Sequence, residues 1–179
     1  VTNDRQVKSI INSLNENQEK SKNWLIDKSK EYFDLLINPK ICVAAGWYGH
    51  IANKLAKYTD QKVLSFDIAP ITKKIGNKLY PDVWFKIEDI ENFEFKNFDV
   101  VVCTSCEHLD PKLLDSMIYK VRAGALVILQ SNNYFEIEEH INCHKSLNDF
   151  EKSIKLNTIL YKGTLKLDKY DRYMIIGTK

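Results

Sequence analysis

The sequence predicts an α/β protein built on a doubly wound, mostly parallel sheet. Apolar runs without polar alternation, such as Ile41–Ala45 and Phe98–Cys103, are typical of strands that are covered on both faces. These runs alternate with segments of helical periodicity, as in βαβ units. At the carboxyl end, residues 156–167 and 170–177 read as two long strands joined by a tight turn, which predicts an antiparallel hairpin.

The elements follow in order from the N-terminus. Residues 4–36 have helical spacing of apolar side chains and predict two amphipathic helices, broken near Asn15–Asn17 and ended by Asn38-Pro39. We therefore predict a helical extension over residues 1–38, acting as a lid or cap, and a main domain over residues 39–179. Within the main domain we predict, in order, helix 51–57, strand 63–66, helix 71–79, strands 83–86 and 98–103, helix 112–121, strand 125–129 and helix 146–154.

Composition limits the class of protein. A chain of 179 residues is long enough for one sizeable core. It has no apolar run of about 18 residues, which argues against a membrane span, and its N-terminus lacks the apolar core of a signal peptide, so we expect a cytoplasmic protein. The net charge of +2 and the scarcity of arginine leave a nucleic-acid partner open without indicating one. The sequence does not indicate an oligomeric state.

The cysteines give no strong metal signal. Cys103 and Cys106 have zinc or redox spacing, and Cys143 with His144 would complete a set of four ligands. However, the first pair lies at a strand end and not at a helix start, where a reactive thiol is expected. We therefore predict no metal site.

A glycine-containing turn points to a nucleoside-bearing cofactor. Gly46 and Gly49 lie where the first strand turns into a helix, so backbone N–H groups can approach a ligand closely. Asp67 ends the next strand, 21 positions after Gly46, where an acid suits the hydroxyls of a ribose.

Several segments together resemble the class I S-adenosylmethionine-dependent methyltransferases. The turn Ala45-Gly46-Trp47-Tyr48-Gly49 is similar to the glycine motif of that family, Asp67 to its acid after the second strand, and Asp89-Ile90 to its adenine-contacting pair. Residues 97–111, with FDVVVC and EHLDP, resemble its fourth-strand segment, and Gly124–Leu129 its fifth strand. The acid that usually precedes the first glycine is missing, because Val43 or Ala44 takes its place.

The resemblance implies a Rossmann-like sheet of seven strands ending in the hairpin, and S-adenosylmethionine as the cofactor. It also implies a set of cofactor-binding residues: Ala45, Gly46, Trp47, Tyr48, Gly49, Asp67, Ile68, Asp89, Ile90 and Thr104. Trp47 and Tyr48 either close over the cofactor or pack against the N-terminal helices.

The resemblance implies methyl transfer, with a small molecule as the favoured acceptor. The cofactor supplies the electrophile, so the protein mainly positions the acceptor, and catalytic residues have no fixed signature. Glu107 and His108 are weak candidates, with His108 as a base, although the pair also suits a structural role beside the next helix. Ser131, Asn132 and Tyr134 are expected to line the acceptor pocket, while His140, Cys143 and His144 lie in a polar loop that either covers the acceptor or is solvated.

Two other functions stay open at this level. A non-catalytic regulatory protein that binds S-adenosylmethionine would keep the same cofactor residues. An NAD(P)-dependent oxidoreductase would fit the degraded glycine fingerprint, but the short chain and the terminal hairpin argue against it.

Overall fold

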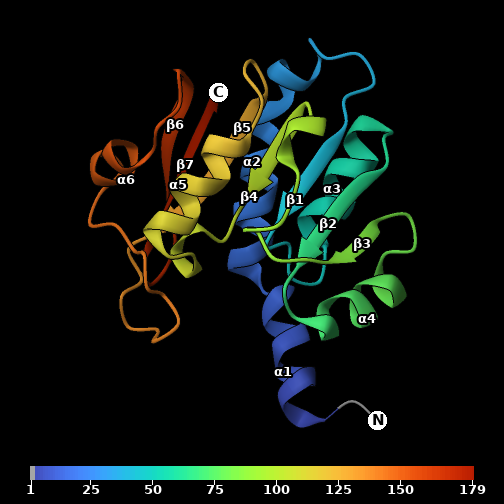
Figure 1. The fold of residues 1–179 in the computed structure, drawn as a ribbon. Helices are drawn as coiled ribbons and strands as arrows, with labels where there is room; N and C mark the ends of the chain where they lie inside the picture. The colour runs from blue at the N-terminus through green and yellow to red at the C-terminus, as the bar shows by residue number, and fades with distance from the viewer. Residues whose placement is uncertain (1–2) are drawn as a thin grey trace.

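The computed structural model describes residues 3–179 as one seven-stranded sheet with helices packed against it (Figure 1). The strands are β1 (Ile41–Ala44), β2 (Val63–Asp67), β3 (Trp84–Ile87), β4 (Val100–Cys103), β5 (Leu126–Asn132), β6 (Thr158–Lys166) and β7 (Asp171–Thr178). The helices are α1 (Asp4–Ser13), α2 (Glu16–Phe33), α3 (His50–Thr59), α4 (Pro70–Leu79), α5 (Pro111–Lys120) and α6 (Leu147–Ser153), with short 3₁₀ turns η1 (Phe95–Asn97) and η2 (Cys106–His108).

The strand order is β3-β2-β1-β4-β5-β7-β6. The first five strands pair in parallel, while β7 is antiparallel to both β5 and β6. The predicted doubly wound sheet with an antiparallel carboxyl-terminal hairpin is therefore confirmed.

Most predicted elements shift by only a few residues at their ends. The strand predicted from Phe98 begins instead at Val100. Asp99, the residue before it, has a side chain that is bonded to neighbouring segments. The Asp99 carboxylate accepts a hydrogen bond from the Lys40 backbone N–H at 2.7 Å and also pairs with Arg122, which turns the chain into the sheet.

Alternation along the strands creates two apolar cores. In β1, Ile41 and Val43 face one core, while Cys42 and Ala44 face the other. Helices α2 and α3 cover the first face, and α5 and α6 cover the second. This two-sided burial explains why the strand sequences lack polar alternation.

The two N-terminal helices are separated where the sequence predicts, since Asn15 caps α2 by accepting a hydrogen bond from the Gln18 N–H at 2.9 Å. Helix α2 is part of the packed core: Leu25 is fully buried, and Ser21 donates a buried hydrogen bond to Gln130 of β5 at 3.0 Å. Helix α1 instead extends from the edge of the molecule (Figure 1). The domain boundary at residue 38 stays a prediction.

No helix of residues 3–179 is long and apolar enough to cross a bilayer.

The strand order also locates the natural ligand crevice. From β1 the chain continues to β2 and β3 on one side of β1, and it then returns to β4 on the other side. The direction in which strands are added to the sheet therefore reverses between β1 and β4. In open α/β sheets, ligands bind outside the carboxyl ends of the strands at such a reversal. The turn after β1 and the segment after β4 are therefore placed at this crevice.

Candidate functional site

The turn after β1 alternates in and out of the left-handed region. Ala45, Trp47 and Gly49 have φ angles of 49°, 51° and 85°. Only glycine adopts this conformation without strain, so Ala45 and Trp47 are held there by their surroundings. Gly46 is crowded for a different reason: an added Cβ would lie 2.1 Å from the Ser65 hydroxyl oxygen and 3.3 Å from a Val43 methyl carbon, so these side chains would have to move.

Asp67 fixes this turn to the end of β2. One carboxylate oxygen accepts the Trp47 backbone N–H at 3.1 Å, and the other accepts the Ala69 N–H at 3.0 Å. Each oxygen keeps a further lone pair, and the side chain is only half-buried. Asp67 can therefore accept two more hydrogen bonds from a ligand at the sheet edge.

The other predicted residues on this side are placed differently from one another. Ile68 is 66% exposed beside Asp67, whereas Ile90 packs into the apolar core beside Phe93. Asp89 is half-buried, and its carboxylate accepts the Glu91 N–H at 2.9 Å. Of these three residues, Asp89 and Ile68 can thus contact a ligand directly, whereas Ile90 cannot.

The two aromatic residues of the turn have separate roles. Tyr48 is buried, and its hydroxyl is 2.8 Å from that of Ser9, so it joins the turn to α1. Trp47 stacks on Tyr48 with ring centroids 5.3 Å apart and lines the crevice. Trp47 and Tyr48 therefore both border the crevice, and Tyr48 in addition packs against α1.

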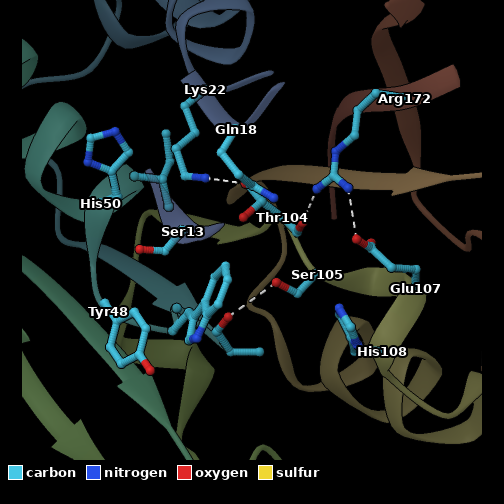
Figure 2. Close-up of a pocket in the computed structure, with 14 residues that line it drawn as sticks. Ser13, Gln18, Lys22, Tyr48, His50, Thr104, Ser105, Glu107, His108 and Arg172 are labelled. Atoms are coloured by element: carbon cyan, nitrogen blue, oxygen red, sulfur yellow. Dashed lines mark hydrogen bonds and ion pairs between the residues drawn. The ribbon is translucent and has the colours of Figure 1, made fainter. Parts of the chain in front are cut away.

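A small cavity of about 50 Å³ lies between this turn, the start of α2 and the end of β4. Figure 2 shows Lys22 and Gln18 entering it from α2, opposite Thr104 and Ser105. The Lys22 ammonium donates to the Gln18 side-chain oxygen at 2.5 Å. The amino group of a lysine thus lines the same cavity as the glycine turn.

Lys22 is an unusual residue for this position, because it is only 6% exposed. Burial, and next the charge of Arg172, lowers the pKa of its ammonium to about 7. Among the described residues, no carboxylate lies within 4.0 Å of the Lys22 ammonium. A ligand carboxylate in the cavity would supply the missing partner.

Arg172 and Glu107 form a buried ion pair at the floor of the crevice. The Arg172 Nη1 donates to Glu107 Oε1 at 2.7 Å, and both side chains are 5% exposed. The other guanidinium nitrogen, Nη2, donates to the Thr104 carbonyl, so the pair joins β7 to the segment after β4 (Figure 2). Glu107 Oε2 has no hydrogen-bond partner within residues 3–179.

A larger groove of about 630 Å³ opens beside the cavity. The two spaces are adjacent, because five residues border both of them: Gln18, Trp47, Glu107, His108 and Arg172. The rest of the groove is mostly polar or aromatic, with Asn12, Asn15, Asn17, Asn132, Tyr134, Ile137, Glu139, His140, Lys169 and Tyr170. Its lining suits a polar ligand with an aromatic or planar part.

Glu107 and His108, the weak catalytic candidates, are brought to this groove but are also bound to protein groups. Glu107 pairs with Arg172, and His108 Nδ1 is 3.1 Å from the Glu139 carbonyl. The cysteines lie elsewhere: Cys103 and Cys106 are fully buried in the core. Within residues 3–179 they form no group with Cys143 and His144 that could share a metal ion.

Sequence reasoning missed Lys22 and Arg172. Arg172 had a signal, since it is one of only three arginines and stands at the start of the apolar run of β7. Lys22 had none, because α2 carries many lysines and only the fold shows which one is buried.

No family model matches the chain, and no curated protein matches it by sequence. Solved structures do match. Magnesium protoporphyrin IX methyltransferase (ChlM) from Synechocystis PCC 6803, with bound SAH, has a TM-score of 0.72 at 15% identity, over 92% of this chain and 88% of that one. The N-methyltransferase NodS from Bradyrhizobium japonicum WM9, also with S-adenosylhomocysteine, has a TM-score of 0.70 at 14% identity, again over 92% and 88%. A TehB-like SAM-dependent methyltransferase from Corynebacterium glutamicum has a TM-score of 0.60 at 16% identity, over 88% and 86%.

These similarities extend over 88–92% of the chain. The chain therefore has the fold of the class I S-adenosylmethionine-dependent methyltransferases, as the sequence motifs predicted.

Proposed function

We propose that this chain is an S-adenosylmethionine-dependent methyltransferase that acts on a small polar molecule. One observation carries the proposal: at the sheet's reversal point, Asp67 holds the left-handed turn after β1 and keeps lone pairs for a ligand. The structures of ChlM and NodS, which hold S-adenosylhomocysteine on the same fold, support the choice of cofactor.

The cofactor's adenosine matches the open part of the edge. The two ribose hydroxyls are donors, and the two Asp67 oxygens are acceptors. Ile68 offers an exposed apolar surface for the adenine ring, and Asp89 offers a carboxylate for its amino group. Ile90, buried in the core, would act through packing rather than through direct contact.

The amino-acid end of the cofactor matches the small cavity. Lys22 is buried without a carboxylate partner, and a cofactor carboxylate would favour its charged form and complete the pair. The turn has Val43 and Ala44 in place of the usual acid, so the ammonium group depends on oxygens near Thr104 and Glu107. The residues present therefore fit the cofactor, with a departure at its ammonium group.

The acceptor matches the groove. In methyl transfer the acceptor's lone pair forms a bond to the methyl carbon while the carbon–sulfur bond breaks and its electron pair stays on sulfur. Trp47 borders both spaces, so an acceptor in the groove would lie next to the cofactor's sulfur end. The protein's contribution is then positioning and exclusion of water. The name of ChlM, which specifies a small-molecule acceptor, supports the same size class.

Calorimetry tests the proposal directly. S-adenosylhomocysteine should bind with a dissociation constant in the micromolar range, about −8 kcal/mol, while NADH and NADPH release no heat. Nicotinamide binding without S-adenosylhomocysteine binding would instead favour an oxidoreductase.

Turnover separates the enzyme from a regulatory protein that merely binds the cofactor. Formation of S-adenosylhomocysteine from S-adenosylmethionine should increase when a panel of small polar amines, phenols and carboxylates is supplied. Cofactor binding without stimulation by any acceptor class, including oligonucleotides, would favour the regulatory alternative.

A further inference from the structure

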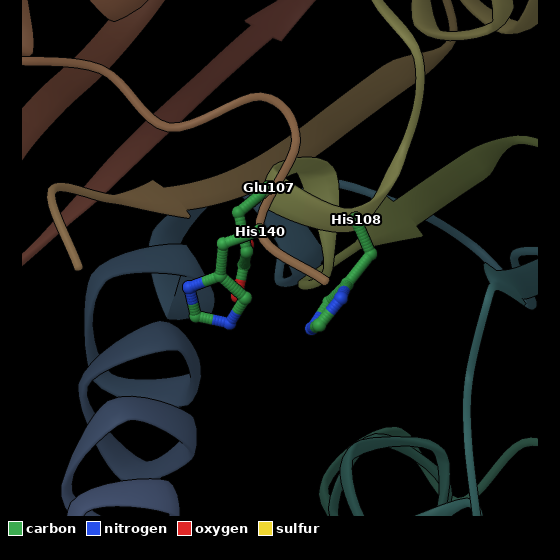
Figure 3. Close-up of side chains that lie close together, drawn as sticks. All are labelled: Glu107, His108 and His140. Carbon is green, nitrogen blue, oxygen red and sulfur yellow. The ribbon is translucent and has the colours of Figure 1, made fainter. Parts of the chain in front are cut away.

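One group of side chains in the groove has the composition of a metal site. Within residues 3–179, Glu107, His108 and His140 are the one group of three His, Cys, Asp or Glu residues whose ligand atoms come within 4.8 Å of one another. Figure 3 shows the three side chains converging, two from η2 and one from the loop after β5.

The loop that carries His140 is anchored to η2. The Asn142 backbone N–H donates to the Glu107 carbonyl at 2.9 Å, and the Asn142 side chain donates to the Cys106 carbonyl at 3.3 Å. These bonds lie two residues after His140 and hold the loop against the other two side chains. The grouping is thus built by the fold.

Both imidazoles have the second hydrogen bond that metal-bound histidines usually have. His108 Nδ1 is 3.1 Å from the Glu139 carbonyl, and His140 Nδ1 is 2.8 Å from the Tyr134 carbonyl. A carbonyl only accepts, so each Nδ1 carries the hydrogen and donates it. In the neutral ring this leaves the lone pair on Nε2, and such a second hydrogen bond is the typical outer partner of a metal-bound histidine.

The carboxylate supplies an independent sign of a ligand. Glu107 is 4% exposed and its Oε2 has no partner within residues 3–179, although its Oε1 is paired with Arg172. A buried oxygen without a partner is costly, so Oε2 is available to accept a ligand, as a second atom of the same ion pair, Arg172 Nε, is available to donate. Arg172 donates a hydrogen bond to this carboxylate and so orients it, as the Glu139 and Tyr134 carbonyls orient the two imidazoles.

We propose that Glu107, His108 and His140 bind a divalent first-row transition-metal ion of the zinc or cobalt type. Two imidazoles and one carboxylate favour such ions over Mg²⁺ or Ca²⁺, which prefer oxygen ligands. Arg172 strengthens this choice, because it offsets the carboxylate's charge and weakens the attraction for a hard cation. Ligand bonds of about 2.0–2.2 Å require the three atoms to approach one another by about an ångström, which the exposed His108 ring permits.

The site would leave coordination positions open toward the groove. Resting on the proposed function, we assign these positions to an oxygen atom of the acceptor, which keeps a further lone pair for the methyl carbon. The ion would lower the pKa of a bound hydroxyl, so that its proton could pass to solvent before the oxygen attacks. The substrate class then narrows to molecules with a metal-binding hydroxyl or carboxylate.

The test is a Co²⁺ titration of the untagged protein, followed by visible absorption without any cofactor. We expect one equivalent to bind with a d–d spectrum, Zn²⁺ to displace it, and a large excess of Mg²⁺ to leave it in place. His140→Ala and His108→Ala should each weaken binding at least 10-fold. His144→Ala and Cys143→Ser are matched controls on the same loop and should bind Co²⁺ as the parent protein does.

Several outcomes would overturn the site. These are the absence of stoichiometric Co²⁺ binding, its loss in the Cys143→Ser or His144→Ala control, or unchanged binding in the His140→Ala protein. Glu107→Gln adds a discriminating measurement on protein whose circular dichroism shows a native fold. If it keeps Co²⁺ binding and instead weakens S-adenosylhomocysteine, Glu107 serves the cofactor's ammonium group. Because the titration needs no cofactor, failure of the metal site and failure of methyl transfer are read separately.

Discussion

The two sides of the carboxyl edge are built in different ways. On the β1–β2 side, the turn after β1 and Asp67 are 20 residues apart and are joined by one short βαβ unit. On the β4–β5–β7 side, the central contact joins Glu107 to Arg172, which are 65 residues apart. A site made within one unit leaves a readable motif, whereas a site assembled by the whole sheet does not. The predictions below test whether the second side depends on those long-range contacts as strongly as the structure indicates.

The largest effect is expected at Arg172. Arg172→Met leaves the Glu107 carboxylate buried without its partner, and breaking a buried pair in this way costs about 3–5 kcal/mol. Urea unfolding followed by circular dichroism measures the loss of stability. The matched control is Arg122→Met, whose pair with Asp99 is exposed to solvent and should contribute only about 0–1 kcal/mol. Equal losses in the two variants would contradict the special role of the buried pair.

Lys22 should make stability depend on pH. Its pKa is lowered to about 7 in the folded protein, chiefly by burial, while an unfolded lysine titrates near 10.5. Between these values the unfolded chain binds more protons, so this residue makes the free energy of unfolding rise with pH. From pH 7 to 9 the rise approaches about 2 kcal/mol, at about 1.4 kcal/mol per pKa unit.

The check is to compare urea unfolding of the parent and Lys22→Met proteins at both pH values. The variant should lose that rise, while Lys57→Met, which changes an exposed lysine of α3, should keep it. S-adenosylhomocysteine affinity gives a second reading, since a cofactor carboxylate prefers the charged ammonium. In the parent protein the affinity should fall above pH 7. If stability and affinity depend on pH in the Lys22→Met protein as they do in the parent, Lys22 neither makes stability depend on pH nor binds the cofactor carboxylate.

Asp67 tests the short-range side of the comparison. Asp67→Ala removes the acceptors for the ribose hydroxyls and should weaken S-adenosylhomocysteine roughly 10- to 100-fold, about 1.5–3 kcal/mol. Because the carboxylate also holds two backbone N–H groups, we expect a loss of stability of about 1 kcal/mol as well. Asp82→Ala, which changes an exposed acid in a turn, is the control for calorimetry. Unchanged affinity in the folded Asp67 variant would show that this acid only braces the turn.

The sequence predicted what neighbouring residues determine. Apolar runs on both faces of the sheet, the break at Asn15 and the terminal hairpin led to the correct fold. The turn after β1 was also located, because its glycine spacing is local. The burial of Lys22 and the pairing of Arg172 with Glu107 could not be found this way, since both depend on segments far along the chain. The left-handed angles at Ala45 and Trp47 were hidden for another reason: neither residue favours that conformation.

The smallest effect is expected at Ala45, and it tests how firmly the turn is held. Ala45 has a φ angle of 49°, and a left-handed alanine costs about 1–2 kcal/mol relative to glycine. Ala45→Gly removes this strain, but the unfolded chain gains freedom that opposes the benefit by about 0.4–1 kcal/mol. The net expectation is a gain in stability of about 0.5–1 kcal/mol, measured by urea unfolding. Ala123→Gly, at an exposed site outside the regular elements and with no positive φ, should show no such gain. If Ala45→Gly destabilises the protein, contacts of the alanine methyl group outweigh the strain, and the turn is held by packing more than by Asp67.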